Sequence, residues 1–329
     1  MGMQTVDHPL SGNLAWTVGT RRSALATTQT RQTLGRLAAA RPDTVFTVRE
    51  IVTKGDRIVD VPLAKVGGKG LFISELEAAL LEGRIDFAVH SMKDVPADVA
   101  DGLVLAAVPA REDARDVLVS RAGHTLESLP PRATVGTSSL RRAAQLLRLR
   151  PDLRIEALRG NIDTRLRRLS GLDAIVLAAA GLARMGWWEG GEALAGESRA
   201  KVVAIPADVM IPAAGQGALA LECRAVDGRS RALLGLLHDA GTAACVTAER
   251  AFLRAVGGSC QVPVGAHAVL AGDAAGVRLT AFLGAPDGSA IVRGQSVGDD
   301  PDAVGRMLAQ ELLEQGGDEW QRLWDGERA

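Results

Sequence analysis

The chain has few aromatic residues. Tyrosine is absent from its 329 residues, and all aromatic side chains together make up 3% of the sequence. Proteins that bind single-stranded nucleic acid stack the bases on aromatic side chains, so this shortage argues against such a partner. The net charge of -1 argues against a generally basic nucleic-acid binder as well, although a local basic patch can be hidden in a neutral total.

Cysteine is scarce too, with three residues in the whole chain. Three widely spaced cysteines do not suggest a disulfide framework, and they suit a reducing cytosol. Cys223 and Cys245 lie in apolar segments, which predicts that they are small core residues. Cys260 instead follows Gly257-Gly258-Ser259, a stretch without bulky side chains. From the residues alone, its thiol is either an inert loop group or an accessible nucleophile.

Long apolar runs and metal-binding patterns are missing as well. The apolar run 174–183 is short and is followed by Arg184, whereas a membrane span needs about 18 or more apolar residues. Residues 1–9 have neither a basic start nor an apolar core, so no signal peptide is expected there. The histidines show no ligand spacing with cysteines or acids, so no metal site is predicted. These absences predict a cytoplasmic protein without membrane contact.

The first hundred residues alternate short apolar runs with helical patterns. Residues 45–52, 85–90 and 101–110 are predicted to be strands, and residues 71–81 an amphipathic helix. Such alternation is typical of a parallel sheet with helical crossovers. The run 218–223 has the pattern of a further strand, which we expect to return the chain to this first sheet.

A second unit of the same kind is predicted from residue 111 onward. Thr17-Val18-Gly19-Thr20 recurs as Thr134-Val135-Gly136-Thr137, in each case followed by serine and then by a helical pattern. Each segment reads as a strand, a glycine turn, a hydroxyl suited to capping and a helix. This junction is also a common βα connection, but two similar α/β domains are the simpler interpretation.

The pattern changes after residue 227. Two helices are predicted around residues 229–255, strands at 264–270, 277–283 and 290–294, a hairpin turn at 285–289 and a helix at 301–315. We therefore predict a first domain of residues 1–109 and 206–228, a second of 110–205, and a small α+β third domain of 229–329. Hinges are expected near residues 109 and 206.

Positive charge is concentrated between residues 132 and 168. Ten arginines there face three acids, a net excess of seven (ten minus three). The arginines are Arg132, Arg141, Arg142, Arg148, Arg150, Arg154, Arg159, Arg165, Arg167 and Arg168. If they were scattered on helix exteriors they would form an ordinary solvated face, and this alternative stays open. Arginine otherwise suits bidentate recognition of small carboxylates, which favours a polycarboxylate ligand.

Two arginine pairs occupy special positions. Arg141 and Arg142 fall in the first turn of a predicted helix, and Arg21 and Arg22 follow a glycine turn in the same way. Free amide groups and the helix dipole already attract anions at such a place, so cations there make sense if an anion binds. Leu140, Ala143, Ala144 and Leu147 are expected to form the inner face of the second helix, so that some of its arginines project elsewhere.

Asp94 is the candidate catalytic acid beside these cations. The predicted strand 85–90 is followed by Ser91-Met92-Lys93-Asp94, at the edge where open α/β sheets bind ligands. Asp94 is either a turn residue or a carboxylate that meets positive charge in the reaction. His90 could be a base, but a histidine at a strand end is more often held by a structural hydrogen bond. The glycine-rich run Lys65 to Gly70 lacks Walker spacing and is interpreted as a mobile lid.

Taken together, these segments resemble the porphobilinogen deaminase family, also called hydroxymethylbilane synthase. The matching motifs are Val18 to Ser23, Val66 to Phe72, Val89 to Pro96, Val135 to Arg142, Leu158 to Asn161, Ala214 to Gly217 and Cys260 to Pro263. The resemblance implies two similar periplasmic-binding-protein-like α/β domains with hinge strands, and a small α+β C-terminal domain. It implies an enzyme of haem and porphyrin biosynthesis that joins four porphobilinogen molecules head to tail, with loss of ammonia, to give hydroxymethylbilane.

The resemblance also implies roles for individual residues. Asp94 would be catalytic, and a dipyrromethane cofactor, itself made from substrate, would be attached to Cys260 as a thioether. Further cofactor-binding residues would be Lys93, Ser139, Arg141, Arg142, Arg165 and Arg184. Substrate-binding residues would be Arg21, Ser23, Gln29, Lys69 and Arg159. The chain is expected to act as a monomer on this small-molecule substrate.

Three points depart from the family pattern or lie outside it. Ser259 stands between the paired glycines and Cys260, and Ala24 replaces a proline at the helix start. Trp187 and Trp188 have no derivable role and are expected to be exposed loop residues. A non-catalytic polycarboxylate-binding protein with two domains is the competing hypothesis, but it leaves Asp94 and Cys260 without a task.

Overall fold

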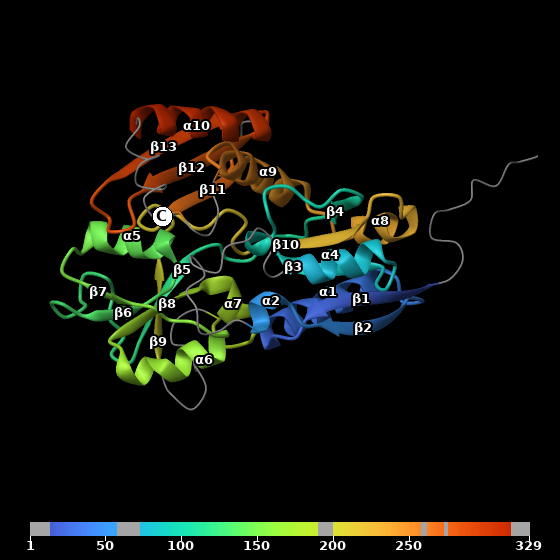
Figure 1. The fold of residues 1–329 in the computed structure, drawn as a ribbon, viewed down its shortest axis with the longest axis horizontal. Coiled ribbons are helices and arrows are strands. Elements are labelled where there is room, and N and C mark those ends of the chain that lie inside the picture. Colours follow the sequence, from blue (N-terminus) through green and yellow to red (C-terminus); the bar gives the residue numbers. More distant parts are fainter. Residues whose placement is uncertain (1–13, 58–72, 190–199, 258–261, 273–275, 317–329) are drawn as a thin grey trace, which may run out of the picture. The chain divides into compact units, whose positions relative to one another are not determined.

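The computed structural model describes most of the chain. The described residues are 14–57, 73–189, 200–257, 262–272 and 276–316. They form three β-sheets with helices packed against them, as Figure 1 shows. They divide into two compact units, the first made of residues 14–57, 73–110 and 219–243 and the second of the other described residues. The boundaries given above for three domains stay a prediction.

The first unit is built on a five-stranded sheet in the order β2-β1-β3-β10-β4. Its strands are β1 (Ala15–Arg21), β2 (Val45–Ile51), β3 (Phe87–Ser91), β4 (Leu103–Ala107) and β10 (Leu219–Arg224). Its helices are α1 (Ala24–Ala40), α2 (Lys54–Arg57), α4 (Ser74–Leu81) and α8 (Gly228–Gly235). β10 runs antiparallel between β3 and β4. This confirms that the segment near residues 218–223 returns to the first sheet.

The second unit contains a sheet of the same design, in the order β7-β6-β8-β5-β9. Its strands are β5 (Asp116–Ser120), β6 (Thr134–Gly136), β7 (Arg154–Glu156), β8 (Ala174–Ala178) and β9 (Lys201–Ile205). Its helices are α5 (Leu140–Leu149), α6 (Ile162–Arg167) and α7 (Ala179–Arg184). In both sheets the fourth strand in the order is the antiparallel one.

A matching contact supports the internal repeat. The backbone N–H of Thr17 donates to the Asp86 carboxylate over 2.7 Å, and that of Thr134 donates to the Asp173 carboxylate over 2.7 Å. Each aspartate directly precedes a strand, β3 or β8, that is the parallel neighbour of the strand containing its threonine. The two predicted α/β domains therefore share strand order, strand direction and a side-chain contact, which confirms the predicted fold class.

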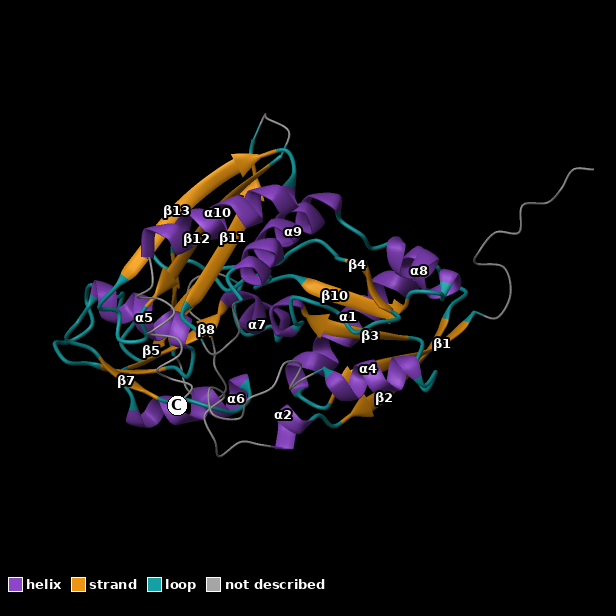
Figure 2. Ribbon diagram, turned by 45° about the horizontal axis from the view of Figure 1, so that its top comes forward, coloured by secondary structure: helices purple, strands orange, loops and turns teal. Residues whose placement is uncertain are grey.

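The second unit also contains a three-stranded antiparallel sheet, the small C-terminal α+β element of the prediction. Its strands are β11 (Val264–Leu270), β12 (Val277–Gly284) and β13 (Ile291–Gly298). The helices α9 (Ala240–Ala255) and α10 (Pro301–Gly316) supply Phe252, Leu308 and Leu312 to the core beneath it (Figure 2). A side chain at Gly305 would meet the carbonyl oxygen of Ala248 at 2.3 Å, so glycine lets these helices approach closely.

Two local expectations need correction here. The helix predicted from residue 71 begins at Ser74 among the described residues, with 71 and 72 outside them. Trp188 is 9% exposed and packs, with Trp187, into the core of the second sheet, so the expectation of exposed loop aromatics is wrong. Both rings add large apolar surfaces to that core, which also contains Ala179 and Leu182 of α7.

Helix α5 also differs from the expectation. Its buried residues are Arg141, Arg142, Ala143, Ala144, Gln145 and Leu146, whereas Leu140 and Leu147 are only half-buried. The helix is covered on more than one side, because the backbone of Gly288 in the C-terminal hairpin approaches its residues Ala144 and Arg148 closely. No helix in the described part of the chain is long and apolar enough to cross a membrane.

Candidate functional site

Asp94 lies at the carboxyl end of β3, where the sequence places it. It closes a short 3-10 turn, Met92–Asp94, in which the N–H of Val95 donates to the carbonyl of Met92 over 3.0 Å. Its side chain is 32% exposed. Because β1 and β3 are parallel neighbours, the last residue of β1 comes to the same edge. That residue is Arg21, whose Nη1 lies 3.7 Å from Oδ2 of Asp94.

Arg21 is shared with a second carboxylate that the sequence analysis missed. Its Nη2 donates to Oδ1 of Asp56 over 2.5 Å, much closer than its contact with Asp94. Asp56 also accepts hydrogen bonds from the N–H and hydroxyl of Thr53, at 3.2 and 2.8 Å. Burial raises the pKa of Asp56, but Arg21 and Thr53 outweigh burial and hold that pKa below its usual value. Of these two carboxylates, Asp56 is therefore the closer partner of Arg21, and the contact of Arg21 with Asp94 is the looser one.

We expect Asp56→Asn to destabilise the protein in a pH-dependent way. The charged hydrogen bonds are worth about 1–2 kcal/mol, which corresponds to about 3–6 °C in the thermal midpoint at pH 7. A lowered carboxyl pKa stabilises the fold above the ordinary pKa, and the effect disappears as pH falls toward the folded pKa. The difference between variant and parent should therefore narrow as the pH falls below about 5 in thermal scans, and should vanish only below the lowered pKa of Asp56.

The matched control for this prediction is Asp43→Asn. Asp43 also pairs with an arginine, Arg41, at 3.1 Å, but its side chain is 52% exposed. Exposed pairs of this kind contribute little. An Asp56→Asn midpoint that differs from the parent equally at pH 7 and pH 3 would contradict the role given to the Arg21 pair.

The start of α1 is fixed against the same edge. Ser23 is the N-cap of α1, and its hydroxyl accepts a hydrogen bond from the N–H of Ala26 over 3.3 Å. Gln29 is buried on α1, and its amide exchanges hydrogen bonds of 3.1 and 3.2 Å with the Ser91 hydroxyl at the end of β3. Arg22 is exposed. The predicted substrate residues Ser23 and Gln29 thus lie in the first two turns of α1, which follows directly after Arg21 at the end of β1.

His90 lies within β3, one residue before its end, and has a structural partner. Its Nε2 lies 2.9 Å from Oε2 of Glu222 on the neighbouring strand β10, and both side chains are almost fully buried. A histidine so enclosed cannot reach a substrate at the sheet edge. The interpretation of His90 as a hydrogen-bonded structural residue is the one that this geometry supports.

In the second unit, Arg141 and Arg142 face a buried acid that the sequence analysis also missed. Asp116 is the first residue of β5, and since β5 is antiparallel, its start lies at the edge where β6 and β8 end. Nη1 of Arg141 and Nη2 of Arg142 each lie 2.7 Å from one of its oxygens. All three side chains are at most 7% exposed. Ser139, the N-cap of α5, accepts from the N–H of Arg142 over 3.4 Å.

Arg184, Arg165 and Arg159 lie elsewhere in the same unit. Arg184 ends α7, and its Nη2 donates to the carbonyl of Gly217 over 2.6 Å. Burial lowers its pKa to about 10, although the charge of Glu112 raises it. Nε of Arg165 donates to the carbonyl of Gly160 over 2.8 Å. Arg159 and Arg165 are half-buried.

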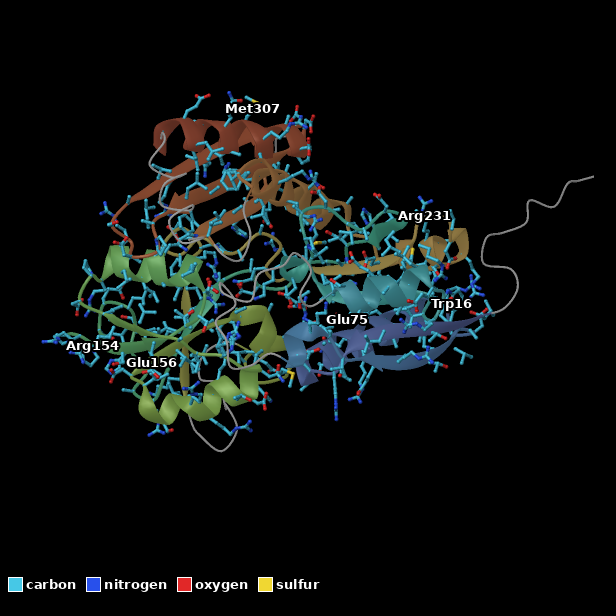
Figure 3. All side chains as sticks on the ribbon, viewed as in Figure 1. Trp16, Glu75, Arg154, Glu156, Arg231 and Met307 are labelled. Atoms are coloured by element: carbon cyan, nitrogen blue, oxygen red, sulfur yellow. The ribbon has the colours of Figure 1, made fainter. Side chains whose placement is uncertain are left out.

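The remaining arginines of the basic run behave as a solvated face. Those that are exposed are Arg132, Arg148, Arg154, Arg167 and Arg168. Arg154 and Glu156 are labelled in Figure 3 on β7, an edge strand of the second sheet. Arg150 pairs with Asp152 over 2.7 Å. The exposed arginines of the run therefore form an ordinary solvated face, whereas Arg141 and Arg142 are buried and remain candidates for binding a carboxylate.

Lys93 is exposed beside Asp94, and it has contacts of its own. Lys69 and Cys260 lie outside the described residues, as does the glycine-rich run predicted to be a lid. The other two cysteines are described, and both are buried. Burial raises the pKa of the Cys223 thiol to about 11, so it is a poor nucleophile. The predictions for Cys223 and Cys245 as core residues are confirmed.

The donor set of the second unit fits a ligand that bears carboxylates. Arg141 and Arg142 bring two buried positive charges to the single negative charge of Asp116. One buried charge is left over, and an uncompensated buried charge is costly. A carboxylate arm of a ligand would offset it and accept the bidentate geometry that guanidinium groups provide.

Family models and similar proteins all indicate porphobilinogen deaminase. The family model described as porphobilinogen deaminase, dipyromethane cofactor binding domain, matches residues 16–232, and that of the porphobilinogen deaminase C-terminal domain matches residues 243–314. The chain is 51% identical over 303 residues to the porphobilinogen deaminase of Brevibacillus brevis, covering 92% of this chain and 94% of that protein. It is 54% identical over 301 residues to that of Geobacillus kaustophilus, covering 91% and 94%.

Among solved structures, the periplasmic aliphatic sulphonate binding protein SsuA from Escherichia coli is similar with a TM-score of 0.39 and 14% identity, covering 74% of this chain and 70% of that chain. CbnR, a LysR family transcriptional regulator, is similar with a TM-score of 0.42 and 11% identity, covering 69% and 71%.

Proposed function

The chain belongs to the porphobilinogen deaminase family, and we propose that the residue groups at its two sheet edges divide the chemistry of that family between them. The chain has porphobilinogen deaminase activity in tetrapyrrole biosynthesis, and it contains the domain that binds the dipyromethane cofactor. The observation that carries the division is the charge balance: the accessible carboxylate of Asp94 at the sheet edge of the first unit, and two buried guanidinium groups around one buried acid in the second.

Asp94 serves the reacting centre. Loss of ammonia from porphobilinogen leaves a cation on the substrate, and the carboxylate of Asp94 stabilises it and helps to remove the pyrrole α-proton afterwards. At an effective dielectric near 20, a charge about 4 Å away is stabilised by about 4 kcal/mol, or about three powers of ten in rate. Arg21, held by Asp56, lies close enough to bind a substrate carboxylate beside it.

The arginines of the second unit hold the carboxylate arms of the cofactor and of the growing chain. Arg141, Arg142 and Arg184 are buried, so their guanidinium groups act in a medium of low dielectric. Arg165 lies on α6 and Arg159 in the loop before it. Ser139 caps the first turn of α5. When bound, the dipyrromethane supplies the free pyrrole carbon to which the first substrate is joined.

Cys260 is the attachment point in this proposal. The motif Cys260 to Pro263 matches the family pattern, and the burial of Cys223 and Cys245 supports the choice. The thiol replaces the amino group of a porphobilinogen: the carbon–nitrogen bond breaks, a carbon–sulfur bond forms, and the thiol proton leaves with ammonia. No oxidant or reductant is needed.

The finer expectations belong here as well. We propose that the enzyme acts in the cytoplasm and as a monomer, on porphobilinogen as its small-molecule substrate. The hypothesis of a non-catalytic polycarboxylate-binding protein is not retained, because the family to which the chain belongs is one of enzymes.

Ammonia release tests the proposed function. Incubation of the purified chain with porphobilinogen should release one ammonia for each porphobilinogen consumed, and four porphobilinogens should disappear for each hydroxymethylbilane formed. Ammonia is measured by a coupled assay, and pyrroles by their colour with an aldehyde reagent. Bovine serum albumin at equal concentration is the control for spontaneous condensation. Binding of porphobilinogen without ammonia release would overturn the proposal.

A further inference from the structure

The loop Ala214 to Gly217, which the sequence analysis noted only as a family motif, is the centre of a buried polar network in the second unit. The N–H of Gly215 donates to Glu249 over 2.6 Å, and the carbonyl of Gln216 accepts from Nε of Arg111 over 2.8 Å. Arg111 and Glu249 are themselves paired at 2.6 Å. The loop is thus fixed from both sides along its backbone.

The side chain of Gln216 leads from this loop to the arginine cluster. It is 1% exposed, and its Nε2 donates to the carbonyl of Ala114 over 2.7 Å and to Oδ1 of Asp116 over 3.0 Å. Gly217 accepts from Arg184 through its carbonyl. Gly217 has φ +87, and a side chain there would meet the carbonyl oxygen of Glu112 at 2.4 Å. The loop therefore packs too tightly for Gln216 to be displaced easily.

Asp116 engages the two arginines unequally. Each nitrogen of Arg142 donates one hydrogen bond, Nε and Nη2 to Oδ1 of Asp116 over 3.0 and 2.7 Å, and Nη1 to the carbonyl of Val176 over 2.8 Å. Arg141 uses only Nη1, which lies 2.7 Å from Oδ2 of Asp116 and donates to the carbonyl of Ile211 over 2.7 Å. Its contact with Oδ2 is close but is not aligned as a hydrogen bond.

Two nitrogens of the Arg141 guanidinium, Nε and Nη2, can therefore donate hydrogen bonds to a ligand. Among the residues that the structure describes, the side-chain hydrogen bond of Arg141 is made by Nη1 and none by Nε or Nη2, although the side chain is only 6% exposed. These two nitrogens form the parallel pair of donors that grips a carboxylate. Burial alone would raise the pKa of Asp116, but Arg141, Arg142 and Gln216 hold it far below its usual range, so the acid stays charged.

We propose that Asp116, held by Gln216, is a positioning residue that orients Arg141 and Arg142 for the carboxylate arm of the first porphobilinogen during covalent loading of the cofactor. The inference rests on the proposed function. Asp116 touches neither substrate nor cofactor in this account. It fixes Arg142 completely and turns Arg141 so that Nε and Nη2 face the incoming arm, and Gln216 prevents the carboxylate from rotating.

The test follows cofactor loading by intact mass rather than turnover. The full chain is produced in a host that makes no porphobilinogen, then mixed with porphobilinogen at several concentrations, and the mass gain is recorded against time. Asp116→Asn keeps the shape and removes the charge, while Gln216→Met keeps the volume and removes both donated hydrogen bonds. Asp152→Asn is the matched control, because it removes another arginine-paired acid of the same unit, one that is exposed.

We expect Arg141 and Arg142 to bind the carboxylate arm of the incoming porphobilinogen more weakly in both variants. A misplacement of about 1 Å costs about a hundredfold in well-oriented reactions, so Asp116→Asn should slow loading by about 30- to 100-fold. Removal of a hydrogen bond to a charged group should slow loading by about tenfold in Gln216→Met. In both variants the porphobilinogen concentration for half-maximal loading rate should rise by about fivefold or more, as expected when one charged hydrogen bond to the arm is weakened. Asp152→Asn should load like the parent.

A merely structural role would give a different signature. Misfolded chains would lower the final fraction that gains mass, while the folded remainder would keep the parent half-maximal concentration. That result in Asp116→Asn overturns the inference. If Asp116→Asn does not fold, Gln216→Met decides, and an unchanged half-maximal concentration there overturns it too. If the parent chain itself gains no mass, the proposed function fails instead.

Discussion

Replacing Asp94 by asparagine is expected to lower turnover about a thousandfold while the chain stays folded. The side chain is 32% exposed at the end of β3, and its one described ion pair, to Arg21, is 3.7 Å long, so little of the fold depends on it. Asparagine keeps the shape but cannot stabilise a cation or accept a proton. Ammonia release at saturating porphobilinogen measures the effect, and the thermal midpoint should move by no more than about 2 °C.

The control for this variant is Asp101→Asn, which changes an exposed acid in the turn before β4. It should leave turnover within about twofold of the parent, because an exposed surface charge contributes little. A turnover number for Asp94→Asn close to that of Asp101→Asn would remove Asp94 from the mechanism. It would leave the roles of the second-unit arginines untouched.

Replacing Cys260 by serine should abolish the covalent mass gain and with it all turnover. A hydroxyl has the same place in the chain but is a far weaker nucleophile than a thiol at neutral pH, because hardly any of it is ionised. Intact mass of the parent, purified from a host that makes porphobilinogen, should exceed the polypeptide mass by two porphobilinogens less two ammonias. The variant should show the bare polypeptide mass.

Cys245→Ser provides the comparison for this second experiment. Cys245 is 6% exposed on α9 and packs into the core under the C-terminal sheet. Serine there costs some stability, since a buried hydroxyl needs a partner, but the covalent mass gain should persist. A dipyrrole mass on Cys260→Ser, or its absence from Cys245→Ser, would move the attachment point away from Cys260.

Much of the fold could be predicted because local pattern and tertiary structure agree. The repeat of Thr17 and Thr134 marks equivalent positions in two strands, and the structure adds the equivalent partners Asp86 and Asp173. The apolar run near residue 219 predicts a strand by its pattern, and the structure confirms the expectation that this strand joins the first sheet. The position of Asp94 follows from the same logic, because the apolar run of β3 gives way to polar residues just before it.

The buried acids could not be predicted in this way. Asp116 and Asp56 each lie in a polar stretch with nothing to distinguish them from surface residues, and their importance comes from partners 25 to 35 positions away, such as Arg141, Arg142 and Arg21. The excess of arginines was a partial signal, because two cations that lie inside a protein require an anion. It could not say which acid supplies it.

The face of α5 was misassigned for a related reason. Helical periodicity assumes one apolar face against one core, whereas α5 is also approached by the backbone of Gly288 from the C-terminal hairpin. Arg141 and Arg142 are buried on this helix because they find an acid and backbone carbonyls there. Sequence patterns assign charged residues to the surface, and a buried arginine can be predicted only when its buried partner is known.

The course of β10 has a consequence for how the protein is made on the ribosome. This strand separates β3 from β4 in the first sheet, yet it begins at Leu219, after the whole of the other α/β sheet has been synthesised. Until Arg224 has left the exit tunnel, β3 and β4 have no neighbour between them, and the apolar side chains of both remain unprotected. The first sheet can therefore be completed only after the strands of the second α/β sheet have been synthesised, and its central pairing depends on contacts between residues far apart in the sequence.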